Sequence, residues 1–209
     1  EFRRVLFRSG CDAEKQWDHI VAASHLDCWE TLAATGAKFQ PLPDVKKPNA
    51  RGCGIPRGVL LTTGPTGIKY SPPVSIDCSL ALALEHVEKI VQEEALAILE
   101  QPIVKMNTLG SFACRKVIGR LAGWSPGISE HALGNAVDVS GFQPKKGPVA
   151  SLLRHYEPDA REPSTKEGRF LRNVQRRVRR ELGLGALGPN FDASHRDHFH
   201  FDAGSPWWK

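Results

Sequence analysis

The chain has 209 residues, of which 41% are hydrophobic and 24% are charged, and this composition excludes intrinsic disorder. Its length is sufficient for one domain with a buried core, and the absence of any apolar run of about 18 residues predicts no membrane-spanning helix. The net charge of +5 favours a polyanionic environment, a condition that both nucleic acid and an acidic cell wall meet.

The first nine residues, EFRRVLFRS, share no pattern with the rest of the chain. Glu-Phe is what a common cloning-site hexamer encodes, so we interpret residues 1–9 as a leader that is not native and exclude them from the fold. We expect residues 10–209 to form a single domain. It would consist of an irregular N-terminal lobe over about 10–102 and a core over about 103–209 that carries the functional site.

Apolar residues at helical spacings predict a helix from Glu14 to about Thr35, with Gly36 as its stop. The following stretch, residues 41–73, is rich in Pro, Gly and Lys, and its apolar pieces GVLLT and GIKYS predict brief strands. The sequence therefore indicates an irregular first half that covalent cross-links would stabilise.

The segment SLALALEHVEKIVQEEALAILEQP carries the strongest helical pattern in the chain. With Ser79 as a possible N-cap and Pro102 beyond its end, it predicts a helix of about 21 residues. The segments PIVKMNTLGSFACR and NAVDVSGF have the β-branched content and the alternation of strands. The second half therefore predicts an α+β fold, in which an antiparallel sheet carries flanking helices on one side.

The basic run RRVRR, residues 176–180, is the best candidate for nucleic-acid binding. However, apolar residues recur at every fourth position through it, namely Phe170, Val174, Val178 and Leu182. This spacing is typical of an amphipathic helix with a solvated basic face. We therefore expect no nucleic-acid partner.

Three of the eight histidines lie in the stretch SHRDHFHFD, residues 194–202. In an extended chain, His198 and His200 point to one face while Phe199 and Phe201 point to the other. Two histidines on one strand can bind a metal ion with a third ligand from elsewhere. Hydrogen-bonded structural histidines explain the pattern equally well.

The stretch SEHALGNAVDVSG, residues 129–141, suggests further ligands. A turn at Gly134-Asn135 could bring His131 and Asp138 together. Asp138 lies between two valines, where burying a carboxylate is costly unless it meets a cation or hydrogen-bond donors. The alternative interpretation is that Asp138 caps a nearby turn.

The chain contains five cysteines: Cys11, Cys28, Cys53, Cys78 and Cys114. They form no C-x-x-C pair and none lies near the histidines, which disfavours a zinc-thiolate site. Disulfides indicate an oxidising compartment and leave one cysteine unpaired, whereas buried free thiols are the alternative.

The pattern Ser129-x-His131-x-x-Gly134-x-Ala136-x-Asp138, followed by His198-x-His200, resembles a known zinc signature. The signature is shared by D-alanyl-D-alanine carboxypeptidases, penicillin-insensitive murein endopeptidases and the hedgehog signalling domain. The chain is more similar still to the bacterial extensin-like C-terminal family. The motifs that carry this resemblance occur in the same order as in the family: GCGIP, DCSLALAL, GSFACR, FLRNV and LGPNFDASHRDHFHFD. The resemblance covers about residues 28–202 and implies a hedgehog/DD-peptidase-like zinc core.

Carried over to this chain, the resemblance implies that His131, Asp138 and His200 bind Zn²⁺. Such a set leaves one coordination position open for water, as expected of catalytic zinc. Many relatives place a glutamate a few residues before the last ligand as the base, and this chain has none there. Its HRDHFH stretch is similar to the His-x-x-His-x-His of the murein endopeptidases, which implies His195 or His198 as the base.

Because His198 shares the strand face of the last ligand, we assign proton transfer or oxyanion support to His198 and an orienting or assisting role to His195. Arg115 corresponds to an arginine that helps hold the substrate in relatives, and a surface arginine is the alternative. Four of the cysteines, all except Cys11, fall on family cysteine positions. They allow two disulfides in one of three connectivities.

The resemblance implies a zinc-dependent peptidase or amidase that cleaves peptidoglycan peptides with metal-activated water. We expect a monomer in the periplasm or otherwise outside the cytoplasm, although these residues contain no export signal. The alternative is a catalytically silent, zinc-stabilised binding module of the cell envelope.

Overall fold

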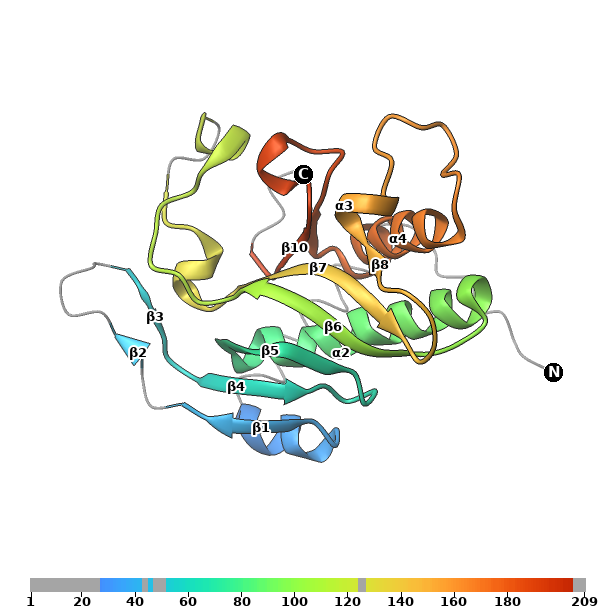
Figure 1. The fold of residues 1–209 in the computed structure, drawn as a ribbon. Coiled ribbons are helices and arrows are strands. Elements are labelled where there is room, and N and C mark those ends of the chain that lie inside the picture. Colours follow the sequence, from blue (N-terminus) through green and yellow to red (C-terminus); the bar gives the residue numbers. More distant parts are fainter. Residues whose placement is uncertain (1–26, 43–44, 47–51, 124–126, 205–209) are drawn as a thin grey trace.

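The computed structural model describes residues 27–42, 45–46, 52–123 and 127–204 (Figure 1). The predicted leader, Cys11 and the first part of the predicted N-terminal helix lie outside these residues. Residues 27–34 are helical and end in a turn at Gly36, whose φ of +85° is in the left-handed region, so the predicted stop is confirmed.

The chain folds as a mixed α+β structure around one eight-stranded sheet (Figure 1). The strand order is β1-β4-β5-β6-β7-β10-β9, and β8 pairs with β7. The strands are β1 (Lys38–Pro41), β4 (Gly58–Thr63), β5 (Lys69–Asp77), β6 (Ile103–Gly110), β7 (Ala136–Pro144), β8 (Ala150–Ser151), β9 (Gly185–Leu187) and β10 (Phe199–Asp202). A second sheet pairs β2 (Val45–Lys46) with β3 (Gly54–Ile55).

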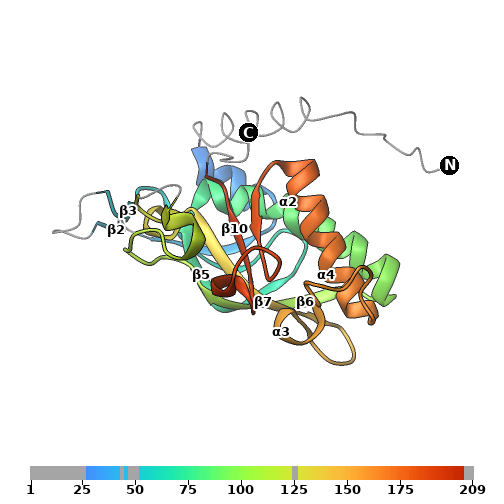
Figure 2. The same cartoon turned by 90° about the horizontal axis from the view of Figure 1, so that it is seen from above.

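The helical elements lie between these strands. They are α2 (Cys78–Glu94), continued by the π-helical turn η1 (Ala95–Leu99), then η2 (Gly119–Gly123), η3 (Glu130–Leu133), α3 (Leu152–His155), α4 (Lys166–Arg177), continued by η4 (Val178–Leu182), and η5 (Ala193–His195). In Figure 2, α2 runs along one face of the sheet beside α4. None of the helices in the described part of the chain is long and apolar enough to cross a membrane.

The sheet is mostly antiparallel, as predicted, but β5 and β6 pair in parallel. The reason is their connection: α2 carries the chain back to the end of the sheet where β5 began, so β6 runs in the same direction. This parallel pair also spans the predicted lobe boundary near residue 102, because β5 precedes the boundary and β6 follows it.

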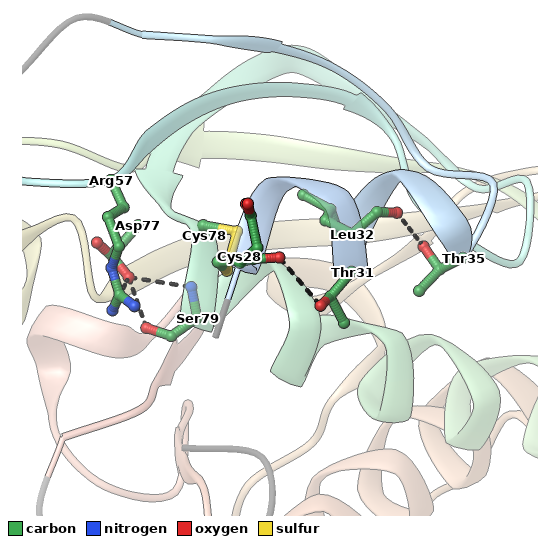
Figure 3. The surroundings of a disulfide bond; sticks show 9 residues. Cys28, Thr31, Leu32, Thr35, Arg57, Asp77, Cys78 and Ser79 are labelled. Atoms are coloured by element: carbon green, nitrogen blue, oxygen red, sulfur yellow. Dashed lines mark hydrogen bonds and ion pairs between the residues drawn. A yellow bond between two sulfur atoms is a disulfide. The ribbon is translucent and has the colours of Figure 1, made fainter. Parts of the chain in front are cut away.

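The long helix begins two positions earlier than predicted. Its N-cap is Asp77 instead of Ser79: the Oδ1 atom of Asp77 accepts a hydrogen bond from the backbone nitrogen of Ser79 at 3.0 Å (Figure 3). Asp77 has the extended backbone of a cap, whereas Ser79 already lies inside the first turn. The helical run ends at Glu100, which has a left-handed φ of 60°, just before Pro102.

Two disulfides stabilise the first half of the chain, as predicted, and the structure gives their connectivity. Cys28 pairs with Cys78, joining residues 27–34 to the start of α2 (Figure 3), and Cys53 pairs with Cys114, joining the segment before β3 to the segment after β6. They close loops of 50 and 61 residues. Loops of this length correspond to about 4 kcal/mol each in the chain-entropy model.

The predicted amphipathic helix through RRVRR is confirmed. Phe170, Val174, Val178 and Leu182 are buried in the core, while Arg176, Arg179 and Arg180 are exposed. The basic residues therefore lie on the outer face of α4 and η4.

Candidate metal centre

His131 is held by the segment that follows β6. It lies in η3, it is 2% exposed, and its Nδ1 lies 2.5 Å from the carbonyl oxygen of Ser111. A carbonyl oxygen can only accept, so Nδ1 donates this hydrogen bond and Nε2 is the ring nitrogen that could bind a metal ion. Gly134 ends η3 with a φ of 67°, and a Cβ there would lie 2.8 Å from Ile55, so only glycine fits this turn. The turn leads directly into β7.

Asp138 and His200 are paired across the sheet. Asp138 lies in β7 and His200 lies directly opposite it in β10, so their side chains project from the same face. The neighbouring Phe199 and Phe201 are buried on the other face, which confirms the predicted separation of histidine and phenylalanine faces. Asp138 is therefore a strand residue, and the alternative interpretation as a turn cap is wrong.

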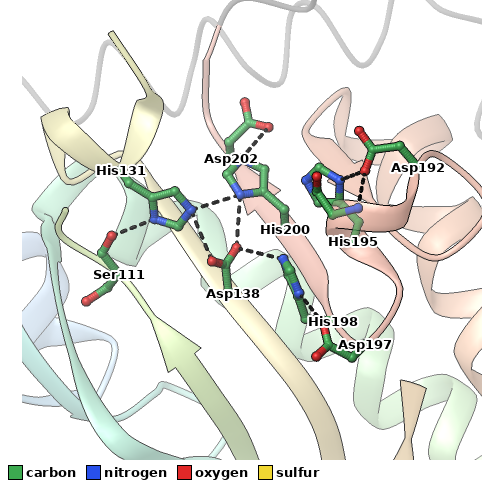
Figure 4. Close-up of polar contacts among 10 residues, drawn as sticks. Ser111, His131, Asp138, Asp192, His195, Asp197, His198, His200 and Asp202 are labelled. Carbon is green, nitrogen blue, oxygen red and sulfur yellow. Dashed lines mark hydrogen bonds and ion pairs between the residues drawn. The ribbon is translucent and has the colours of Figure 1, made fainter. Parts of the chain in front are cut away.

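The three side chains converge (Figure 4). Nε2 of His131 lies 3.1 Å from Nδ1 of His200 and 3.2 Å from Oδ2 of Asp138, and Nδ1 of His200 lies 3.0 Å from Oδ1 of Asp138. Zinc bonds of about 2.0–2.1 Å in a tetrahedron place ligand atoms about 3.3 Å apart. The spacing of these three ligand atoms therefore fits a zinc ion.

The hydrogen-bond partners of the two histidines support a cation between the three ligand atoms. Nε2 of His200 faces Oδ2 of Asp202 at 3.5 Å, an orientation that leaves Nδ1 facing Asp138 and His131. The lone pairs of two neutral imidazoles and a carboxylate would then face one another, which is unfavourable unless a proton or a metal ion lies between them. Carboxylate or carbonyl acceptors on the distal histidine nitrogens are characteristic of metal ligands.

The electrostatics of this cluster follow from the same contacts. Burial lowers the pKa of His200, but Asp138 and Asp202 outweigh burial and raise that pKa to about 9. Burial would raise the pKa of Asp138, whereas hydrogen bonds and charge from His131 and His200 hold it well below its usual range. Asp138 is therefore ionised at neutral pH, and a metal ion would compete with a proton for His200.

His198 lies beside the cluster but contacts one of its members only. Its Nε2 lies 3.6 Å from Oδ1 of Asp138, and its Nδ1 lies 2.9 Å from Oδ1 of Asp197 (Figure 4). The Asp197 carboxylate thus orients the His198 ring. This position next to the three converging atoms suits a group that transfers a proton.

His195 is oriented by a carboxylate that the sequence reasoning missed. Its Nδ1 lies 2.7 Å from Oδ1 of Asp192, which also accepts from the backbone nitrogen of Ser194 at 2.9 Å. Burial lowers the pKa of His195, and Asp192 opposes that shift. The ring of His195 lies 5.3 Å from that of His198 between centroids. The sequence signal for this contact is an aspartate three residues before a candidate histidine.

The sequence analysis also missed Asp202 as the partner of His200. Asp202 follows His200 at strand spacing and therefore shares its face.

A cavity of about 430 Å³ opens beside these residues and makes them accessible to a reactant. Asp138, His195, His198 and His200 line it, together with Arg115 and an apolar wall of Val117, Ile118, Ile128 and Leu187. The structure thus brings five of the six predicted site residues to one cavity and places His131 directly behind it. Arg115 is half-buried in the cavity wall, and its guanidinium group donates to the carbonyl oxygen of Lys116 at 3.4 Å.

The wall that carries Arg115 is a short antiparallel pairing. The backbone nitrogen of Ser129 donates to the carbonyl oxygen of Arg115 at 3.0 Å, and that of Val117 donates to Gly127 at 2.9 Å. The Cys53–Cys114 disulfide lies directly before this segment. Covalent and backbone bonds therefore hold the wall in place next to His131.

No curated protein and no solved structure matches the chain. The sequence profile of the family described as Extensin-like protein C-terminus matches residues 26–207, which includes both histidine motifs and all four disulfide-bonded cysteines. Because this match extends over most of the chain, the protein belongs to the Extensin-like protein C-terminus family.

Proposed function

We propose that the protein is a zinc-dependent peptidase or amidase that acts on peptidoglycan peptides. The observation that carries this proposal is the convergence of one potential ligand atom from each of His131, Asp138 and His200 beside a cavity. Two neutral imidazoles and one carboxylate are a donor set that suits zinc and leaves a coordination position open. The same proposal includes a relationship to the carboxypeptidase, murein endopeptidase and hedgehog group. It also includes a zinc core of the type found in that group.

Zinc bound there would supply a Lewis acid that activates water and polarises an amide carbonyl. His198 takes the proton from the attacking water, because its Nε2 lies next to the ligand Asp138 while Asp197 fixes its ring. His195, fixed by Asp192, lines the same cavity and can donate a proton to the leaving amine, and the proton that His198 took from water then restores His195. Arg115 can bind a carboxylate of the peptide with its two-pronged guanidinium group.

The proposed location is the periplasm or another compartment outside the cytoplasm, and the proposed form is a monomer. Two disulfides are compatible with an oxidising compartment. The net charge of +5 suits an anionic cell wall as the partner.

The test combines metal analysis with digestion. We expect the purified protein to bind one zinc ion and to cleave muropeptides, with products identified by mass spectrometry. His198→Ala should retain zinc and lose cleavage, whereas His86→Ala, on α2 away from the cavity, should retain both. Full zinc occupancy without cleavage of any murein peptide by the wild type would instead favour the binding module.

A further inference from the structure

A second hollow, of about 870 Å³, lies along the outer face of α4 and η4. Residues 161–163 of the segment between α3 and α4, which loops out in Figure 1, line it, and Asn190 lines it from the segment between β9 and β10. Six arginines contribute to its lining: Arg161, Arg169, Arg172, Arg176, Arg179 and Arg180. Glu162 is the one carboxylate among the described residues that line it.

Two of these arginines make their hydrogen bonds to neutral oxygens. Arg172 donates to the carbonyl oxygens of Ala160 at 2.7 Å and Pro158 at 3.3 Å, and Arg176 donates to the side-chain oxygen of Asn173 at 2.7 Å. None of these acceptors is a carboxylate.

Arg177, which faces the end of α2 and does not line the hollow, has different partners. It binds the carboxylates of Glu93, Glu94 and Glu181 at 2.7–3.1 Å, and these contacts raise its pKa despite partial burial. The protein therefore neutralises the cation that packs against α2 with three carboxylates, whereas the hydrogen bonds of Arg172 and Arg176 in the hollow go to neutral oxygens.

The spacing of the arginines makes the hollow an elongated site. Arg169, Arg172, Arg176 and Arg180 follow one another at intervals of three or four residues, so they lie on one face of the helix. At about 1.5 Å per residue this row extends over about 16 Å. All six cations are arginines, whose planar fork binds phosphate or carboxylate oxygens in pairs.

We propose that this hollow binds a single chain that carries several phosphate groups. A phosphate offers more than one pair of oxygens and more negative charge than a carboxylate, which matches several guanidinium groups around one space. A concave hollow of this volume has the size of a ligand pocket and holds one extended chain, whereas a rigid duplex is too wide to enter it.

Nucleic acid is less well matched than a simple phosphate chain. Sites for single-stranded nucleic acid combine cations with exposed aromatic rings on which bases stack. The aromatic residue that lines this hollow, Tyr156, is 2% exposed and has Arg172 over its ring at 5.8 Å. The hollow therefore provides cations without an accessible ring.

The site is independent of the metal centre. The segment between β9 and β10 separates the two hollows, because Asn190 lines the arginine hollow while Ser194 and His195 line the metal-site cavity. Phosphate binding should therefore persist after zinc is removed with a chelator. Failure of the zinc proposal and failure of this one can thus be told apart.

The experiment measures binding of a fluorescently labelled short polyphosphate to the full chain across a series of NaCl concentrations. We expect the logarithm of the association constant to fall with the logarithm of the salt concentration, with a slope of about −0.7 for each phosphate contacted. The double variant Arg176→Glu/Arg180→Glu should bind at least about tenfold more weakly and show a shallower slope.

The matched control is Lys38→Glu/Lys69→Glu, which changes the net charge equally on β1 and β5, far from α4 in Figure 1. This control should bind like the wild type, and thermal unfolding should show that both double variants are folded. Equal losses in the two double variants would overturn the proposal, because they would indicate a general charge effect. Equal or tighter binding of polyglutamate or of a single-stranded oligonucleotide of the same charge would overturn the assignment to a phosphate chain.

Discussion

Zinc affinity in three histidine variants distinguishes ligands from neighbours. Nitrogens of His131 and His200 lie 3.0–3.2 Å from the other members of the cluster, whereas His198 reaches only the Asp138 carboxylate, at 3.6 Å. We therefore expect His131→Ala and His200→Ala to lose zinc. His198→Ala should keep zinc and lose turnover.

The size of the loss follows from the number of ligands. Zinc sites with four protein ligands bind with about 10–16 kcal/mol, so an equal share is about 3–4 kcal/mol per ligand. Removing one ligand should weaken zinc binding by about two to three powers of ten. For His198→Ala, the zinc affinity should stay within about tenfold of the wild type, because His198 contributes no ligand atom.

The assay is competition for zinc against a chromophoric chelator, with His86→Ala as the control and circular dichroism to verify folding. Because His131 is 2% exposed, its variant also needs a thermal unfolding curve with and without zinc. Equal zinc loss in all three site variants would move His198 into the ligand set. Unchanged affinity in His131→Ala or His200→Ala would refute the proposed site.

Two further variants test residues around the cluster, and a third tests a buried hydrogen bond between β5 and α2. Asp202→Asn should weaken zinc binding by about 10- to 100-fold, because its carboxylate orients a ligand ring, and unchanged affinity in the same competition assay would show that it does not. Asp192→Asn should shift the alkaline limb of kcat/KM for muropeptide cleavage to lower pH. The carboxylate raises the pKa of the proton donor His195 against burial, so its loss lowers that pKa, and a shift to higher pH would contradict this role. Tyr70→Phe should reduce the free energy of unfolding in urea by about 1–3 kcal/mol, because the phenol donates at 2.6 Å to the buried carboxylate of Glu88; an unchanged unfolding midpoint would count against this cost.

Much of the secondary structure could be predicted because its signals are local. Apolar residues at every third or fourth position mark α2 and α4, and alternation marks β7 and β10, since helix and strand periodicity place those side chains on one face whatever they pack against. The same alternation predicts that His198 and His200 share a face. The candidate metal ligands could be named from the resemblance of their motifs.

The N-cap and the parallel strand pair were decided by tertiary structure. Asp77 and Ser79 are both good caps, and the choice depends on where β5 ends, which its pairing with β4 determines. The two prolines of β5 lie opposite the register shift in β4, where an N–H is not needed, so this strand is longer than the brief one predicted.

The sequence by itself indicated the helices α2 and α4, the strands β7 and β10, and which of their side chains share a face, and its resemblance to known motifs named the candidate metal ligands. Only the tertiary structure decided how the four cysteines pair, that Ser111 and Asp202 direct the distal nitrogens of the histidines, and that the arginines of α4 surround a hollow. The physical reason is the range of the interactions. Periodicity acts over a few neighbouring residues, whereas His200 meets Asp138 across 62 residues of chain, and that meeting depends on the register of β7 against β10.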